Sequence, residues 1–246
     1  MEYGFVKLVL RVCALLGALC LVNPLNAETY ELSFEALWSA TEHPTNYPVG
    51  DWPDVPSAAH YSPIIGASHS DAMTIWAAGD MSSEGVENVA ETGNRTVLEA
   101  MIDSSPNVHN KIVHPAGFAT PDVTVGPLTF EVNEEYPLVS FLTMIAPSPD
   151  WFVGVSRLDL RDGGDFVDSL TVDLFAYDAG TENGTLFSTD NPATDPQGTI
   201  TSVDQAALFG GSSPVARATF TLVPEPNTGL LAVIAVGGIL IVRRRR

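Results

Sequence analysis

The chain has 246 residues and a formal net charge of −19 at pH 7. Its central part, residues 28–226, contains only five lysines and arginines against 29 aspartates and glutamates, which gives a net charge of −24. Such a surface repels nucleic acid and anionic membranes and attracts cations, so we do not expect a nucleic-acid partner. Acidity also keeps an exported protein soluble, and for most of these acids that explanation is sufficient.

The first 27 residues are predicted to be a secretory signal peptide. A segment with two basic residues is followed by an apolar stretch at residues 12–22, and the sequence LNA before Glu28 fits a cleavage site. An N-terminal membrane helix is the alternative, which the shortness of the apolar stretch disfavours. Cys13 and Cys20 both lie in this segment, so the mature chain is expected to have no disulfide, catalytic thiol or cysteine-bound metal.

The C-terminal segment, residues 223–246, contains a Pro-Glu-Pro turn, an apolar stretch at residues 229–242 and four final arginines. The apolar stretch spans about 21 Å as a membrane helix, against about 30 Å of hydrocarbon in a bilayer. The pattern closely resembles the PEP-CTERM sorting signal of Gram-negative bacteria. This resemblance implies export, transient insertion into the inner membrane and cutting by an exosortase-type peptidase near the Pro-Glu-Pro. A simple C-terminal membrane tail is the alternative.

Between these two ends, residues 28–222 are long enough to form one domain with a substantial core. Apolar and polar residues alternate along several stretches, and each stretch is predicted to be a strand with one buried face. These stretches are residues 30–38, 128–132, 169–176 and 216–222. Residues 138–146 are apolar at both parities, which predicts a central strand that is buried on both faces.

Two short helices are predicted between these strands. The first begins near Ser83 and ends at Gly93, and the second runs from about Thr96 to Ser104. Many strands joined by loops rich in proline and glycine favour two packed sheets. We therefore expect a mostly β fold, an antiparallel β-sandwich with two short helices, placed between the signal peptide and the C-terminal membrane helix.

The stretch APSPDWFVGV, residues 146–155, places a carboxylate between two prolines and a tryptophan. Prolines cannot continue a hydrogen-bonded ladder, so the central strand is expected to end at Ala146. Asp150 is then held at the rim of the sandwich. A second carboxylate, Asp178, continues the inward parity of residues 170–176 and is expected just where that strand ends.

A third acid, Glu182, follows in the turn DAGTENG, four residues after Asp178. Carboxylates that converge need a cation or a proton. Calcium prefers about six to eight oxygen ligands, which carboxylates, loop carbonyls and water supply. Asp150, together with the turn that carries Asp178 and Glu182, can therefore supply the core of a ligand shell for a hard cation such as calcium.

Four motifs together resemble the spondin domain, the N-terminal module of F-spondin and mindin: HYSPIIGASHS, SEGVENVAETG, APSPDWFVGV and DAGTENG. The resemblance spans about residues 30–222 and implies a β-sandwich that binds calcium. The implied ligands are Asp150, Asp178 and Glu182. Animal members usually have aspartate at the last position, so Glu182 can coordinate through a different oxygen or a water, and Asn183 can share the role. Animal members also have cysteines that are missing here, so stability is expected to come from packing and metal.

Three further features have both a structural and a functional interpretation. Trp151 is expected to cap the sandwich and orient the Asp150 loop, and an exposed aromatic anchor for a ligand is the alternative. His69 is interpreted as a structural histidine, because the members of a hydrolase triad normally come from distant segments. The acidic run at residues 159–168 is interpreted as a solvated loop rather than a second cation loop, because it lacks EF-hand spacing.

The sequence thus predicts an exported, calcium-stabilised β-sandwich that is not an enzyme. The resemblance to spondin domains implies adhesion at the cell surface or in the extracellular matrix, with a polysaccharide or a surface protein as the partner. The competing function is that of an extracellular hydrolase acting on polysaccharide or ester, with paired carboxylates as acid and base. Carboxylates that already share a cation disfavour this second function.

Overall fold

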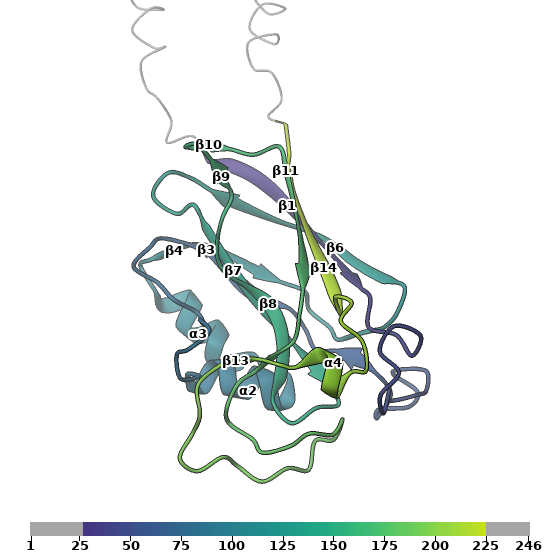
Figure 1. Cartoon of the computed structure of the whole chain (residues 1–246). Coiled ribbons are helices and arrows are strands. Elements are labelled where there is room, and N and C mark those ends of the chain that lie inside the picture. Colours follow the sequence, from purple (N-terminus) through teal and green to yellow (C-terminus); the bar gives the residue numbers. More distant parts are fainter. Residues whose placement is uncertain (1–26, 225–246) are drawn as a thin grey trace, which may run out of the picture.

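The computed structural model describes residues 27–224, which form two antiparallel sheets packed face to face and three short helices (Figure 1). The predicted signal peptide up to residue 26, and the predicted sorting segment from residue 225 onwards, lie outside the described residues. Within the described part, no helix has the length and apolar character needed to cross a membrane. The predicted mostly β, antiparallel fold is confirmed.

The first sheet has four strands. Their order is β11 (Ser169–Leu174), β14 (Ala216–Leu222), β1 (Glu28–Ala36) and β6 (Val123–Val132). Every second side chain of β1 is buried from Tyr30 to Ala36, and Trp38 just beyond the strand is buried as well. The alternation that predicted these strands therefore identifies which side chains are buried in the core and which face the solvent.

The second sheet is built around a hairpin of two long strands, β7 (Leu138–Ala146) and β8 (Trp151–Asp159). The shorter strands are β2 (His60–Tyr61), β3 (Ile65–His69), β4 (Val108–Val113), β5 (Phe118–Ala119), β12 (Tyr177–Asp178) and β13 (Thr201–Ser202). All nine residues of β7 are buried, and this strand pairs with β8, β3 and β2. The predicted central strand is confirmed.

The acidic run after β8 forms a small hairpin of β9 (Arg161–Asp162) and β10 (Asp165–Phe166). Asp162 and Asp165 are exposed at its tip. Asp159 accepts hydrogen bonds from the Arg161 side chain, with 2.9 Å between Oδ1 and Nε. The interpretation of this run as a solvated loop agrees with these exposures.

Two helices, α2 (Glu84–Thr92) and α3 (Thr96–Ser104), cover the face of the second sheet that points away from the first sheet. Ser83 caps α2, and its Oγ accepts a hydrogen bond from the backbone N–H of Val86 over 3.4 Å. Gly93 ends the helix in the left-handed region with φ of 70°. Both helices therefore have the bounds that the sequence predicted.

A third helix, α4 (Gln205–Leu208), corrects the expected number of two. It is a single turn whose first N–H groups are capped by Asp204, with 3.1 Å from the Ala207 nitrogen to Asp204 Oδ1. One turn is too short to produce a recognisable hydrophobic period, so the sequence pattern gave no signal for it.

The structure has two hydrophobic cores. The first lies between the sheets, where Phe141 of the second sheet meets Phe34 and Phe220 of the first, with ring centroids 6.3 and 6.4 Å apart. The second lies between the second sheet and the helices, and Leu142 and Phe152 contribute to it from the sheet. Successive residues of β7 thus face different cores, which is why this strand has no polar face.

Candidate metal centre at the end of the second sheet

The position of Asp178 depends on a crossing of the chain between the sheets. The alternation predicted one continuous strand that leads to Asp178, and this is wrong. Strand β11 ends at Leu174, the Ala176 amide is held by the Gln205 side chain over 2.9 Å, and β12 joins the second sheet. There Asp178 pairs with Trp151, the first residue of β8. The crossing brings Asp178 next to the turn that carries Asp150.

Asp150 lies in the turn between β7 and β8 and is fully buried. Its Oδ2 accepts hydrogen bonds from the Thr181 nitrogen at 2.7 Å, the Thr181 hydroxyl at 3.2 Å and the Glu182 nitrogen at 3.0 Å. Its Oδ1 is buried and has no hydrogen-bond partner among the described residues. An orphaned buried carboxylate oxygen is unfavourable, and a cation is the partner that suits it best.

Trp151 is fully buried, and its ring contacts Phe187 and Phe209 with centroids 5.4 and 5.7 Å apart. Its Nε1 donates to Asp178 Oδ2 over 3.3 Å. The burial agrees with the interpretation of Trp151 as a structural residue that caps the sandwich, and the exposed-anchor alternative is wrong. Burial raises the pKa of Asp178, and the charge of Asp150 raises it further.

Glu182 follows in the loop after β12 and is half-buried. Burial raises the pKa of Glu182, and the charges of Glu91 and Asp150 contribute to the same shift. The neighbouring Asn183 side chain donates to the Ala193 carbonyl over 3.2 Å. Asp150 is thus a common electrostatic neighbour of Asp178 and Glu182, and the structure brings all three predicted residues to one end of the second sheet.

Glu91, in the last turn of α2, belongs to the same group and was not predicted. Burial raises the pKa of Glu91, and the charges of Glu87 and Asp150 raise it further. The helix and the loops that follow β12 lie at the same end of the molecule (Figure 1). The motif SEGVENVAETG contains Glu91, but nothing in the local pattern shows that its neighbours come from segments more than 50 residues away.

Carboxylate oxygens are suitable ligands for a hard cation. In the structure, however, the side chains do not converge closely enough to surround an ion. Within residues 27–224, no three Asp, Glu, His or Cys side chains converge closely enough to hold a metal ion in their present rotamers. Asp150 is fixed, whereas Glu182 and Glu91 are longer and half-buried, so rotations of these two would be needed for a compact shell. An all-oxygen donor set is typical of calcium or magnesium.

Among residues 27–224, no lysine or arginine forms an ion pair with these carboxylates. The described residues include five such side chains, and each one forms ion pairs elsewhere: Arg95, Lys111, Arg157, Arg161 and Arg217. Their partners do not include Asp150, Asp178, Glu182 or Glu91. Within the described chain, a positive charge for this group has to come from outside the protein.

His69 is fully buried, as is Ser140, and 2.8 Å separate His69 Nε2 from Ser140 Oγ. His69 Nδ1 lies 2.9 Å from the Ser70 carbonyl oxygen, so both ring nitrogens have partners. Burial lowers the pKa of this histidine. The pair has no access for a substrate, and the interpretation of His69 as a satisfied structural histidine is confirmed.

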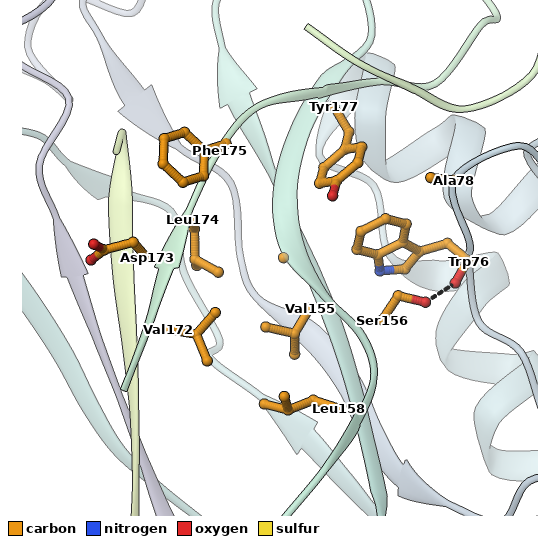
Figure 2. Close-up of a pocket in the computed structure, with 11 residues that line it drawn as sticks. Trp76, Ala78, Val155, Ser156, Leu158, Val172, Asp173, Leu174, Phe175 and Tyr177 are labelled. Atoms are coloured by element: carbon orange, nitrogen blue, oxygen red, sulfur yellow. Dashed lines mark hydrogen bonds between the residues drawn. The ribbon is translucent and has the colours of Figure 1, made fainter. Parts of the chain in front are cut away.

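A groove of about 280 Å³ lies between β8 and β11, at the edges of the two sheets (Figure 2). Phe175 and Tyr177 line it together with apolar side chains of both strands. Asp173 is the one carboxylate among its lining residues, and its Oδ1 lies 2.7 Å from Arg217 Nε. A glycosidase needs two carboxylates on either side of the scissile bond, and this groove lacks the second one.

Comparison with known proteins identifies relatives of most of the described region. Residues 28–215 match the family model described as Spondin_N. The chain is 36% identical to Spondin-2 of Rattus norvegicus over 190 residues, which cover 76% of this chain and 55% of that protein. It is 38% identical to Spondin-1 of Mus musculus over 176 residues, which cover 68% of this chain and 21% of that protein. The chain therefore spans about half the length of Spondin-2 and a fifth of Spondin-1.

Proposed function

The chain belongs to the Spondin_N family, and on that basis we propose that it is an exported, calcium-stabilised binding module that adheres to extracellular material. Its partner would be an extracellular polysaccharide or a surface protein, at the cell surface or in the surrounding matrix. The surface is acidic, and the groove between β8 and β11 contains a single carboxylate that is paired with Arg217, which favours binding over hydrolysis in that groove. Binding through a rigid scaffold requires that the loops at the sheet ends be fixed.

The observation that carries the calcium proposal is Asp150 Oδ1, which is buried and has no partner among the described residues. Asp150, Asp178 and Glu182 would hold the ion. When bound, calcium supplies the positive charge that offsets the mutual repulsion of these carboxylates. Asp150 would then hold the loop after β12 through its Oδ2 hydrogen bonds and the ion through its Oδ1. The site would in this way join the β7–β8 turn to the β12 loop.

Calcium removal tests this proposal directly. At a hundredfold excess of free calcium over the dissociation constant, binding would raise the free energy of unfolding by about 2.7 kcal/mol. Asp150→Asn and Asp178→Asn should remove most of this stabilisation, and Glu182→Gln should remove less. Asp173→Asn is the matched control, because Asp173 is paired with Arg217 and should leave the calcium effect unchanged. Identical melting temperatures of the wild-type protein in calcium and in EGTA would contradict the site.

We also propose that the C-terminal segment is a sorting signal that an exosortase-type peptidase removes after export. The mature protein should then end near Pro224-Glu225-Pro226 and lack the four arginines, which would hold the segment on the cytoplasmic face. Glu225→Ala should disturb this processing and leave the folded domain intact. Intact-mass measurement of the surface protein decides the matter, and a chain that still ends in Arg246 would favour a permanent membrane tail.

A further inference from the structure

Both sheets have an unpaired edge at the groove between β8 and β11. Strand β11 ends the order of the first sheet, and β14 is its only partner among the described strands. Strand β8 pairs with β12 only at Trp151 and Phe152, so the same edge of β8 has no strand beside it further along within residues 27–224. Free edges present backbone N–H and C=O groups with which another chain can pair. Two such edges border one groove here.

One hydrogen bond shows which backbone groups of β11 face its free edge. The Asp168 carbonyl, just before the strand, accepts from the Leu222 N–H of β14 over 2.9 Å. In an antiparallel pair, successive residues direct their backbone groups to opposite sides. Ser169, Thr171 and Asp173 therefore direct their N–H and C=O groups to the free edge, and all three residues are exposed. Within the described chain, no backbone hydrogen bond outside the ladder with β14 involves them.

The two edges of the first sheet differ in how they are protected. The opposite edge strand, β6, contains Pro127, and its register with β1 shifts between Leu32 and Phe34. Prolines and bulges prevent an edge from pairing with a further strand. Strand β11 contains no proline, and its register with β14 is regular from Ser169 to Leu174. The edge of β11 is therefore suited to receive another strand.

The groove beside β11 is lined mainly by apolar side chains. Figure 2 shows Val172 and Leu174 of β11 on one side and Val155 and Leu158 of β8 on the other. Phe175, where the chain leaves β11, is 43% exposed. A strand laid along β11 would direct every second side chain into this groove, because side chains alternate between the two faces of a sheet.

The polar side chains of the groove already have partners. The Ser156 hydroxyl donates to the Trp76 carbonyl, and Asp173 is paired with Arg217. This leaves little for the many hydroxyl groups of a saccharide to bond with. An extended peptide needs less from side chains, because its own backbone pairs with the free edge and its apolar side chains fill the groove. The groove therefore favours a polypeptide over a polysaccharide.

A row of charges across the first sheet ends at the same edge. Asp173 of β11 lies opposite Arg217 of β14, which lies opposite Glu35 of β1. The Arg217 Nε is 2.7 Å from Asp173 Oδ1, and its Nη1 is 3.6 Å from Glu35 Oε2. Two carboxylates thus share one guanidinium, and the row ends in a carboxylate. The next position of the row would belong to an added strand, and a basic residue is favoured there. The strongly acidic chain would repel a second copy of itself and attract a basic segment.

We propose that the free edge of β11 and the groove beside it bind an extended segment of another protein, in which apolar and polar residues alternate and a lysine or arginine lies next to Asp173. The segment would add one strand to the first sheet and place its apolar side chains against Val155 and Leu158. This inference rests on the proposed binding function, whose partner it specifies as a polypeptide, and does not involve the calcium site.

A synthetic peptide tests the proposal on the exported protein. Valine and threonine alternate in this peptide, one lysine replaces a central threonine, and fluorescence anisotropy measures its dissociation constant. Thr171→Pro removes the N–H that faces the free edge and keeps the ladder with β14, so it should weaken binding by about tenfold. Thr171→Ala is the matched control, because it loses the same hydroxyl but keeps the N–H, and its affinity should equal that of the wild-type protein. Wild-type affinity in Thr171→Pro would overturn the inference.

A second peptide tests the charge row and needs no variant of the protein. It has glutamate in place of the lysine and should bind the wild-type protein about tenfold more weakly, because its charge would lie beside Asp173. Asp173→Asn should reduce the difference between the two peptides. Equal affinity of the wild-type protein for both peptides would contradict the proposed position of the basic residue and overturn the inference.

Hydrogen exchange locates the bound peptide. The lysine peptide should slow exchange of the Ser169, Thr171 and Asp173 amides, and dextran at the same mass concentration should not. Protection of these amides by dextran, or no protection by the peptide, would overturn the inference and leave the proposed function intact, since adhesion can use another surface. An exported protein that adheres to neither polysaccharide nor surface protein would contradict the proposed function itself.

Discussion

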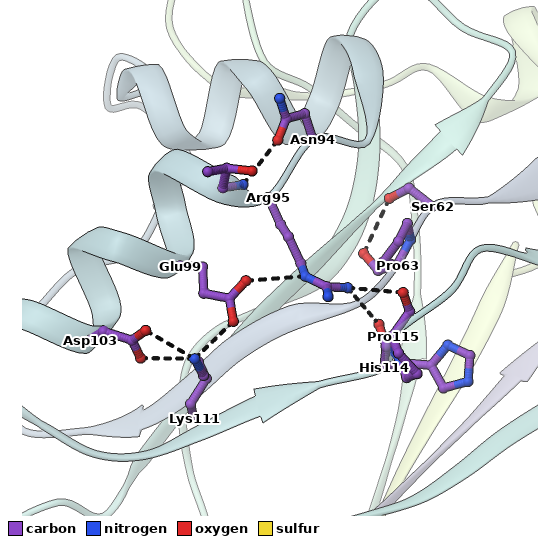
Figure 3. Close-up of polar contacts among 10 residues, drawn as sticks. Ser62, Pro63, Asn94, Arg95, Glu99, Asp103, Lys111, His114 and Pro115 are labelled. Carbon is purple, nitrogen blue, oxygen red and sulfur yellow. Dashed lines mark hydrogen bonds and ion pairs between the residues drawn. The ribbon is translucent and has the colours of Figure 1, made fainter.

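Two groups of acids in this molecule differ in what neutralises them. On the helical face, Glu99 and Asp103 of α3 surround Lys111 of β4, whose Nζ lies 2.8 and 2.9 Å from their carboxylate oxygens (Figure 3). Arg95 reaches the other oxygen of Glu99 at 3.2 Å. At the end of the second sheet, the carboxylates around Asp150 have no such partner among the described residues.

The pKa shifts in the two groups have opposite directions. The Lys111 ammonium lowers the pKa of Glu99, whereas burial raises the pKa of Asp178, and Asp150 adds to that rise. The first group is complete in itself and half-exposed, so its ion pairs contribute little to stability. The second group surrounds the fully buried Asp150 and has no internal cation among the described residues. An acidic protein can therefore contain many carboxylates. Only those that are not already paired with a lysine or arginine are candidates for binding a cation from solution.

The largest expected effect comes from substitutions of Asp150, which distinguish the roles of its two carboxylate oxygens. Asp150→Ala removes the acceptor of the Thr181 and Glu182 backbone N–H groups, which should destabilise the fold by about 2–4 kcal/mol even in EGTA. Asp150→Asn keeps an acceptor oxygen and should cost about 1 kcal/mol in EGTA, while losing the calcium effect. Urea unfolding of both variants with and without calcium measures the difference. Equal destabilisation of the two in EGTA would show that the Oδ2 hydrogen bonds matter little.

A smaller effect is expected from Thr181→Val, which removes the hydroxyl that lies 3.2 Å from Asp150 Oδ2 and keeps the backbone hydrogen bond. The loss of one donor to a carboxylate should cost about 1–2 kcal/mol in EGTA. Bound calcium would itself stabilise the ionised Asp150, so the cost should shrink in calcium. Thermal melts under both conditions test this, and a larger cost in calcium than in EGTA would argue against an ion beside Asp150.

The sequence predicted the local features of this fold because local interactions determine them. Ser83 and Gly93 delimit α2 through a cap and a left-handed residue, and the alternation in β1 follows from one buried face. The crossing after Leu174 was missed because the parity of apolar residues continues through Ala176 although the chain changes sheets. That change depends on a hydrogen bond from the Ala176 amide to the distant Gln205, which no local pattern contains.

The candidate site was predictable in part for the same reason. Two motifs supplied Asp150, Asp178 and Glu182, because proline and glycine turns mark where such acids are held. Glu91 was missed because its role depends on how α2 packs against the end of the second sheet. Asp150, whose charge contributes to the raised pKa of Glu91, is 59 residues away in the sequence. Tertiary packing decides such a proximity, and helix periodicity only indicates that Glu91 is next to the buried face.

Removing Lys111, the ammonium group that neutralises Glu99 and Asp103, tests whether an internal cation is what distinguishes the two groups of acids. Lys111→Met leaves Glu99 with Arg95 alone and leaves Asp103 without its ammonium partner. Because the pairs are half-exposed, we expect a loss of about 0.5–1 kcal/mol at low salt that diminishes at high salt. The calcium stabilisation should be the same as in the wild-type protein. A calcium response that grows in Lys111→Met would mean that exposed acids also contribute to binding.

The smallest expected effect concerns the pH dependence of Glu99. Its pKa is lowered below the ordinary value of 4.5, chiefly by its hydrogen bond with Lys111. A group whose pKa is lower in the folded state binds fewer protons there than in the unfolded chain, so its contribution is present above the unfolded value and disappears as the pH falls through the folded one. Glu99→Gln should therefore be less stable than the wild-type protein by about 0.3–0.5 kcal/mol at pH 7. This difference should vanish below the lowered pKa. Urea unfolding in EGTA from pH 7 to pH 3 measures it, and a difference that grows toward low pH would show that Lys111 does not stabilise the ionised form.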